Sequence, residues 1–374
     1  YRFRLAFGGG LSSINPNTTW DMYLHLGGFS AEYGNSLSSI LEVESRLGNR
    51  NRIRAQGTFN FTDVNGVIDG PLPYGIGSFL VSVRRTYYDF IANGISESNS
   101  AFPFYFEINN KLTFDLSKSN RLILSFTRNR EGTELLNEFS DELNLTEDAT
   151  SYIGSLAWRK YHGEKWQFNT VFSYYSDDIK YRAFTIDTLD QEEDYEALDS
   201  RVVNYAFKTN IRYKTGDESW LNWGFTTTRI PSDVNFEAAD LSFLYARVES
   251  PRDIKFDDTY NYYATYLESS TKATEKLHLR IGARYDHSSL IDEGELSPRF
   301  SIWYQFNDRT SIEGSWGLFY QYPDPAAVYT RNIPVDLSEN LGIISAEKST
   351  HQILSIQHDF SSTLSAKLQL YNKD

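Results

Sequence analysis

The sequence contains no cysteine, a single methionine and no apolar stretch long enough for a membrane-spanning helix. The absence of cysteine excludes a disulfide scaffold, thiolate metal sites and cysteine catalysis. A spanning helix needs about 20 consecutive apolar residues, and the mean hydropathy here is −0.48, so a helical membrane protein is excluded as well. Basic residues are outnumbered, because 36 Lys and Arg stand against 50 Asp and Glu and give a formal charge of −14. A chain this acidic offers no broad surface for phosphates, and we expect no nucleic-acid partner.

Aromatic side chains are abundant by contrast, with 26 Tyr, 25 Phe and 7 Trp in a chain that is polar on average. Many of them fall into runs of period two. In residues 276–285, apolar side chains from Leu277 to Tyr285 alternate with basic residues and glycine. The runs at 299–306 and 309–320 repeat the pattern. Period two is typical of β-strands whose two faces meet different surroundings, so the sequence predicts an all-β protein.

The connections between these runs alternate in length along the chain. The short ones span Ser117–Asn120, His162–Lys165, Thr215–Ser219, Asn307–Arg309 and Ser361–Ser362. The long ones are polar and acidic and span about 131–149, 179–199, 231–257 and 324–346. Aromatic residues that fit interfacial girdles near strand ends are Trp158, Trp166, Tyr213, Trp220, Tyr285 and Tyr320. Short periplasmic turns and longer extracellular loops are typical of a transmembrane antiparallel β-barrel, which is the fold we predict.

The strand count suggests that the barrel continues beyond the sequence. We count roughly 15 strands from about residue 53 onward, whereas single-chain bacterial barrels close with an even number. The chain also stops at Asp374 in what reads as the middle of a strand. An unpaired edge in lipid would leave backbone groups without partners, so we expect further strands after Asp374.

The first 50 residues differ from the rest. Glycines at Gly8–Gly10, Gly27–Gly28 and Gly34 punctuate this stretch, with short strand pieces only at Tyr1–Phe7 and Leu37–Arg46. Such a composition favours compact irregular structure rather than a lipid-facing wall. We therefore divide the chain into residues 1–50 and a barrel of residues 51–374.

Three stretches carry a resemblance to a known family. Residues Gly27–Arg46 read GGFSAEYGNSLSSILEVESR, which resembles the closing segment of the plug domain of TonB-dependent outer-membrane receptors. Residues Gly282–Pro323, with their Arg-Tyr-Asp, Ser-Pro-Arg and Phe-Tyr markers, are similar to barrel strands of that family. Residues Ala346–Phe360 resemble the Glu-Lys-Ser/Thr start of a later strand.

The resemblance implies a barrel of about 22 strands, incomplete here, around a luminal plug of which residues 1–50 are the C-terminal part. It also implies a bacterial outer-membrane location, contact with outer-membrane lipid, and coupling to TonB, the energy transducer of the inner membrane. The upstream plug and the segment that touches TonB are absent from this sequence. Residues that we expect to anchor the plug are Gly27, Gly28, Phe29, Glu32, Tyr33 and Gly34.

The polar faces of the later strands are candidates for the barrel lumen. Side chains that point inward if the apolar faces meet lipid are Arg280, Arg284, Arg299, Trp303, Gln305 and Glu313. They would suit a small anionic or carbohydrate-like ligand. The alternative, which we favour, is that they bond to the plug or to neighbouring strands and touch no ligand.

Enzymatic chemistry and metal binding find little support. No two of the six histidines have metal-ligand spacing on one element, and no nucleophile set stands out, so we expect no catalytic residue, no metal site and no cofactor. Carboxylates cluster in residues 131–148 and 187–199, where they could hold calcium. Without the spacing of a calcium loop, a solvated extracellular surface is the better interpretation.

Three functions remain open. The first is energy-coupled uptake of a scarce nutrient, of the iron-chelate, cobalamin or glycan class, through a plugged barrel. The second is a passive channel of about 14 to 16 strands with an N-terminal hatch. The third is a receptor-fold barrel that serves as a scaffold in an outer-membrane complex, with a surface lipoprotein as partner.

Overall fold

The computed structural model describes residues 14–87, 103–135, 144–186, 192–238, 252–323 and 344–374. Within these ranges nearly all regular structure is β-strand, and the one helical turn is a 3₁₀ turn at Pro73–Gly75. No helix in the described ranges is long and apolar enough to cross a membrane. The all-β prediction is confirmed.

Seventeen strands make up the described fold. Their bounds are β1 Thr19–His25, β2 Ile40–Ser45, β3 Arg54–Phe59, β4 Asp63–Pro71, β5 Gly77–Thr86, β6 Phe104–Ser117, β7 Asn120–Leu135, β8 Asn144–His162, β9 Trp166–Ile186, β10 Glu192–Gly216, β11 Ser219–Ala238, β12 Arg252–Thr274, β13 Leu277–Ser288, β14 Glu293–Asn307, β15 Thr310–Gln321, β16 Glu347–Asp359 and β17 Ser365–Lys373. The sequence predicts β2 but not β1, whose apolar Trp20, Met22 and Leu24 alternate over too few residues to be distinctive.

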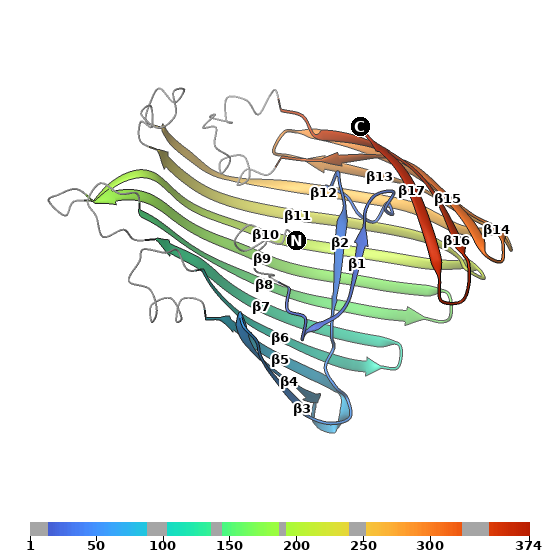
Figure 1. The fold of residues 1–374 in the computed structure, drawn as a ribbon, viewed down its shortest axis with the longest axis horizontal. Coiled ribbons are helices and arrows are strands. Elements are labelled where there is room, and N and C mark those ends of the chain that lie inside the picture. The colour runs from blue at the N-terminus through green and yellow to red at the C-terminus, as the bar shows by residue number, and fades with distance from the viewer. Residues whose placement is uncertain (1–13, 88–102, 136–143, 187–191, 239–251, 324–343) are drawn as a thin grey trace.

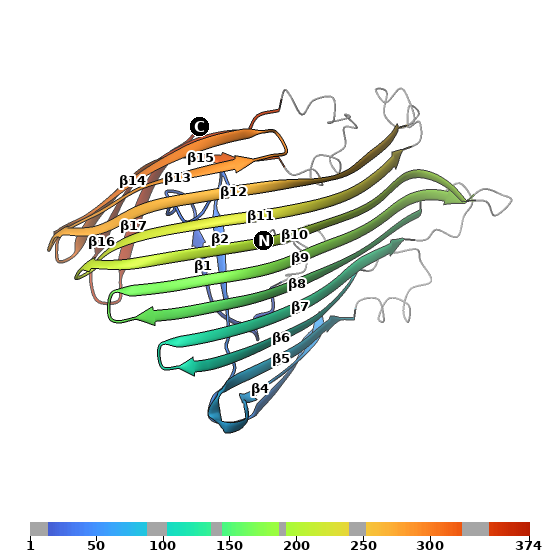
Figure 2. The same cartoon turned by 180° about the vertical axis from the view of Figure 1, so that it is seen from behind.

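Strands β3 to β17 form one antiparallel sheet of fifteen strands, in which each strand pairs with its neighbours in sequence. The number agrees with the count from the sequence. The sheet curls strongly, and β1 and β2 form a separate hairpin that lies across its concave face (Figures 1 and 2). The two edge strands, β3 and β17, do not pair with each other, so the barrel wall is open in the described structure. We call this concave surface the inner wall.

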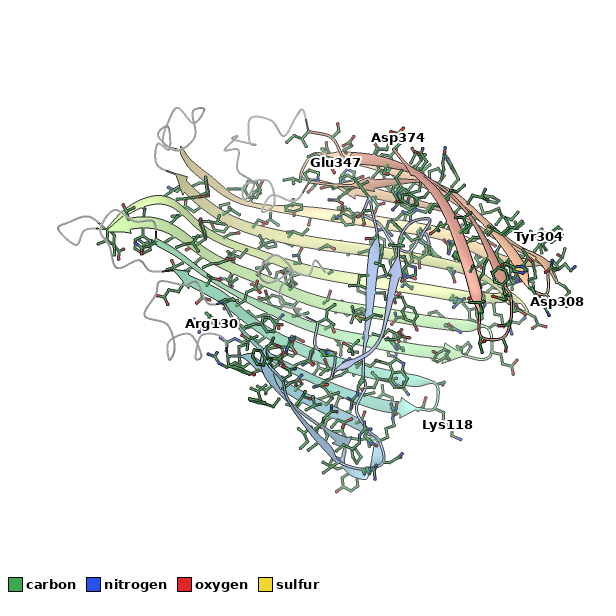
Figure 3. All side chains as sticks on the ribbon, viewed as in Figure 1. Lys118, Arg130, Tyr304, Asp308, Glu347 and Asp374 are labelled. Carbon is green, nitrogen blue, oxygen red and sulfur yellow. The ribbon has the colours of Figure 1, made fainter. Side chains whose placement is uncertain are left out.

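The two ends of the sheet differ. All five predicted short connections are tight links between paired strands, and they gather at one end of the sheet, which we call the turn end (Figure 1). Lys118 and Asp308 mark this end, and Arg130 and Glu347 lie toward the opposite end (Figure 3). Strand β3 starts at the turn end, so the chain passes from the β1–β2 hairpin into the wall on that side.

Three of the four long connections are shorter than the sequence predicts, whereas the fourth agrees, because β15 ends at Gln321 and β16 begins at Glu347. Strand pairing continues far into the other three, because β7 extends to Leu135, β9 to Ile186 and β11 to Ala238. The remaining parts of these predicted loops (136–143, 187–191, 239–251 and 324–343) lie outside the described residues. The prediction failed for these three connections because the strands were found by apolar side chains on the outward face and polar ones on the inner face. In this region the apolar side chains lie on the inner face and charged ones lie on the outward face.

Strand β9 shows this change. Its outward side chains run from Trp166 through Phe172 to Tyr174, which covers about 26 Å of strand at about 3.3 Å per residue. That length is comparable with the apolar band of about 25 Å in outer-membrane barrels. Beyond the band the outward side chains of β9 include Asp178, Lys180 and Arg182, and Asp178 pairs with Arg201 of β10 at 3.3 Å.

The inner wall changes in the opposite sense. Toward the opposite end it carries a buried apolar cluster made of Ala149, Ile179, Leu198, Val234, Phe236 and Phe256. Where the strands leave the apolar band, the inner wall therefore becomes apolar and the outward face carries ion pairs. The prediction that Trp220 belongs to an interfacial girdle is wrong. Trp220 lies on the inner wall, where the Arg212 guanidinium is 4.2 Å from its ring centroid.

Candidate functional site: the N-terminal segment on the inner wall

Residues 14–53, which we call the inner segment, contact the inner wall at two places. The first contact is made by residues 26–39, which connect β1 to β2 and contain the glycine-rich motif. The second is made by residues 14–18 together with Arg46 and Leu47. The two places lie on different halves of the sheet, β10 to β17 and β4 to β6.

Three arginines of the inner wall hold the motif by its backbone carbonyls. Arg280 donates to Gly28 O at 2.7 Å. Arg284 donates to Glu32 O at 3.0 Å. Arg299 donates to the carbonyls of Ser30 and, at 2.7 Å, Tyr33. The motif thus presents its carbonyl groups to a row of guanidinium groups.

Two carboxylates add to this contact, one from the wall and one from the inner segment. Glu268 of β12, which is 3% exposed, accepts hydrogen bonds from Ser30 Oγ at 2.9 Å and from Ala31 N at 2.7 Å. In the inner segment, Glu32 accepts from Lys208 Nζ at 2.8 Å and from Asn210 Nδ2 at 2.6 Å. Because a buried charge needs partners, the Glu268 carboxylate is stable only while the segment is docked or while water takes the place of the segment, whereas Glu32 is partly exposed.

One aromatic side chain fills the centre of the contact. Phe29 is 3% exposed and packs on Phe319, with ring centroids 4.5 Å apart. His351 lies edge-on at 6.0 Å, and the Arg299 guanidinium lies 5.3 Å from the Phe29 ring centroid. This is the largest apolar side chain of the motif, and it is enclosed on several sides by the wall.

The glycines allow the backbone to approach the wall closely. Gly28 has φ +59°, and a Cβ there would collide with Ser315 of β15. A Cβ on Gly34 would collide with the Arg284 guanidinium, and one on Gly27 would lie 2.8 Å from Ile353 Cδ1. A substitution at any of these positions requires the segment or the facing side chain to shift, and at Gly28 the positive φ adds backbone strain.

The hydroxyl of Tyr33 bonds to another residue of the inner segment and not to the wall. It donates to Glu42 of β2 at 2.7 Å, and burial together with this carboxylate raises the pKa of the phenol well above its usual range. Tyr33 therefore stays protonated and braces the loop against its own hairpin.

The second contact is polar as well. Asn15 is 4% exposed and donates to Ser82 and Glu107, and it accepts from Asn65. Nearby, Asp69 of β4 forms ion pairs with Arg46 at 3.1 Å and with Arg54 at 2.8 Å. Side chains of the wall therefore form hydrogen bonds with the inner segment at both of its contacts.

The six residues predicted to line the lumen share the inner face of β13 to β15, as the strand register requires. Arg280, Arg284 and Arg299 contact the inner segment. The other three lie toward the turn end and contact the sheet instead. Trp303 packs edge-on against His278 with centroids 5.3 Å apart, Glu313 lies 3.5 Å from Lys367, and Gln305 donates to Asn307 O.

Several wall residues of this site are missed by sequence reasoning. They are Lys208, Asn210, Glu268, His351 and Lys373. His351 contacts Leu37 O at 2.7 Å through Nε2, and Lys373 donates to Ser38 O at 2.7 Å. The partners are separated by 176 to 347 residues in sequence, and no local pattern announces such a contact.

Several of the described acidic residues of the predicted loops pair with basic neighbours. Arg182 contacts Asp194 at 2.6 Å and Glu192 at 3.0 Å, and Arg130 contacts Asp148 at 2.6 Å. In the described ranges no group of three His, Asp or Glu side chains is arranged to hold a metal ion.

Comparison with known families identifies the wall. The family model described as "TonB dependent receptor-like, beta-barrel" matches residues 87–374. The chain belongs to the TonB-dependent receptor family. Members of this family are β-barrel transport proteins of the bacterial outer membrane, so this receptor is an outer-membrane protein and not an enzyme.

Solved structures share the fold of this TonB-dependent receptor. The outer membrane transporter YddB from Escherichia coli aligns with a TM-score of 0.68 and 12% identity, over 94% of this chain and 55% of that one. The ferric enterobactin receptor PfeA from Pseudomonas aeruginosa gives 0.67 and 14%, over 96% and 58%. The ferripyoverdine receptor of P. aeruginosa, bound to ferripyoverdine, gives 0.66 and 12%, over 90% and 50%. This chain thus spans between 50% and 58% of the length of these structures. No match was found among curated proteins.

Proposed function

We propose that the protein takes up a scarce nutrient through the barrel with energy supplied by TonB, and that residues 14–53 belong to a plug that must move. The observation that carries this proposal is the chemistry of the contact. The motif is held mostly by hydrogen bonds to charged wall residues: Arg284 and Arg299 donate to its carbonyls, and Glu268 accepts from it. Water can replace such bonds when the segment is pulled away, so displacement costs far less than opening an apolar core.

Iron chelates of the siderophore type are the substrate class that we propose. Structures with the same fold include a ferric enterobactin receptor and a receptor bound to ferripyoverdine. Cobalamin and glycans are the alternatives within the family. Uptake of a labelled iron chelate, cobalamin and an oligosaccharide by cells that carry the full-length receptor distinguishes the three classes.

Movement of the inner segment is tested with a disulfide tether. An ideal Cβ on Gly282 lies 3.1 Å from Ala31 Cβ, and a disulfide needs about 3.8 Å, so A31C/G282C can be joined with a small shift. The chain has no other cysteine to interfere. We expect oxidised A31C/G282C to lose uptake and to regain it on reduction.

The control is S155C/S173C, which joins β8 to β9 across the inner wall without touching the segment. This variant should transport equally well when oxidised and reduced. Undiminished uptake by oxidised A31C/G282C would refute movement of the segment. Equal uptake with and without the energy transducer would refute energy coupling and favour a passive channel. Absence of any uptake, with a surface lipoprotein that copurifies, would favour a scaffold.

A further inference from the structure

A hollow lies on the outward face of the wall, at the edge of the apolar band nearest the opposite end. It has a volume of about 460 Å³ and extends over β8 to β11. Its lining includes Gly154, Phe172, Tyr174, Tyr205, Phe207 and Arg229. Family members present short turns to the periplasm, so this end faces the cell exterior and the hollow faces the outer leaflet.

A missing side chain creates the hollow. Gly154 lies on the outward face of β8 opposite Tyr174, and a Cβ there would meet nothing nearer than Tyr174 Cβ at 3.9 Å. Next to this gap two aromatic pairs stand on β9 and β10. Phe172 and Phe207 have ring centroids 4.8 Å apart, and Tyr174 and Tyr205 have centroids 5.4 Å apart. The surface is thus recessed, apolar and of a width suited to an alkyl chain.

A cation closes one side of the hollow. Arg229 of β11 is exposed and lies opposite Tyr205 in the ladder. Three other outward-facing arginines near this edge have acidic partners: Arg130 with Asp148, Arg182 with Asp194, and Arg201 with Asp178. In the part of the chain that the structure describes, no acidic side chain lies within ion-pair distance of Arg229.

We propose that this hollow binds one phosphate-bearing lipid of the outer leaflet. An acyl chain lies over Gly154 against the paired aromatic rings, and the phosphate accepts hydrogen bonds from the Arg229 guanidinium. A guanidinium offers paired N–H donors that match phosphate oxygens. Tyr205, opposite Arg229, and Tyr174, on the far side of Tyr205, have amphipathic rings, which are typical of the headgroup level. The site thus offers an apolar recess and a cation within one row of residues across β8 to β11, as a lipid with an alkyl tail and a phosphate requires.

The site is tested by lipid binding to the full-length receptor in detergent, followed by native mass spectrometry. The probes are diphosphorylated lipid A and the same lipid after enzymatic removal of its phosphates. We expect one tightly bound lipid A per receptor, with the dephosphorylated form bound at least about tenfold more weakly. Inorganic phosphate in excess should leave the complex intact, because it cannot fill the apolar recess.

Two variants address the two parts of the site, and each has a matched control. Gly154→Phe fills the recess, and its control is Gly66→Phe, at an outward glycine of β4 whose Cβ would also meet open space. Arg229→Gln removes the cation, and its control is Arg201→Gln, whose arginine pairs with Asp178. Heat-modifiable mobility on gels shows that each variant is folded.

We expect Gly154→Phe and Arg229→Gln to lose the bound lipid and both controls to keep it. Equal retention by all four variants would mean nonspecific lipid contact and would overturn the proposal. If Arg229→Gln and the dephosphorylated lipid both bind like the wild type, the phosphate assignment is wrong. These results do not depend on uptake, so the lipid site and the proposed transport function can fail separately.

Discussion

Glu268 gives the sharpest prediction about how the inner segment is held. Its carboxylate accepts from Ser30 Oγ and from Ala31 N, and it is 3% exposed. Glu268→Gln keeps the volume but leaves one carbonyl oxygen, and it removes a negative charge that compensates the buried Arg299. A hydrogen bond to a charged group contributes about 1.5–3 kcal/mol, so we expect the docked segment to lose about 2 kcal/mol.

Hydrogen exchange measures this loss directly, because the Ala31 amide is itself one of the donors. A loss of about 2 kcal/mol corresponds to about 30-fold faster exchange of that amide. The control is Glu313→Gln, on the same inner face but in contact with Lys367 rather than with the segment. Unchanged protection at Ala31 in Glu268→Gln, or equal acceleration in both variants, would refute the reasoning.

Three further changes test the two contacts. Phe29→Ala should weaken docking by about 3–4 kcal/mol, because a buried ring is removed from the wall, and protease cleavage within residues 26–39 should increase; no increase would contradict the packing. Gly28→Ala should have a similar effect through the collision of its Cβ with Ser315, measured as faster exchange of the same residues. Asp69→Asn should lower stability by about 3 kcal/mol, because it leaves Arg46 without its buried partner. Denaturant unfolding in detergent measures this loss, and an unchanged midpoint would argue against a structural role for the ion pair.

The strands of the wall were predictable where their two faces meet lipid and water. Within the band, residues such as Ile281 and Arg284 alternate, and the structure places them on opposite faces, 57% and 5% exposed. The turns were predictable for the same reason, since short polar links such as 163–165 interrupt the alternation. Beyond the band both faces meet water or other protein, and the pattern no longer distinguishes strand from loop. Lys180 and Asp199 were therefore predicted as loop residues although they are paired strand residues.

Of the two parts of the site, the sequence predicted the motif of the inner segment but not its partners on the wall. The motif at residues 27–34 has a distinctive sequence, because close approach to the wall demands glycine and small residues. Its partners have no such signature. Glu268 and Lys208 are single polar residues on long strands, and their roles arise from contacts across more than 170 residues. Those contacts depend on the curl of the whole sheet, which the sequence of any one strand does not specify.

The central claim is that the outward face of the sheet meets lipid and that the inner wall meets water and the inner segment. Single spin labels on the cysteine-free chain test it most directly, at Phe172→Cys on the outward face, at Ser173→Cys on the inner wall and at Asp178→Cys beyond the band. In lipid vesicles, we expect the label at 172 to be accessible to oxygen but not to a water-soluble nickel chelate. The labels at 173 and 178 should show lower oxygen accessibility, and the label at 178 should be open to the chelate. A label at 172 that is open to the chelate, or a label at 173 that is immersed in lipid, would contradict the account.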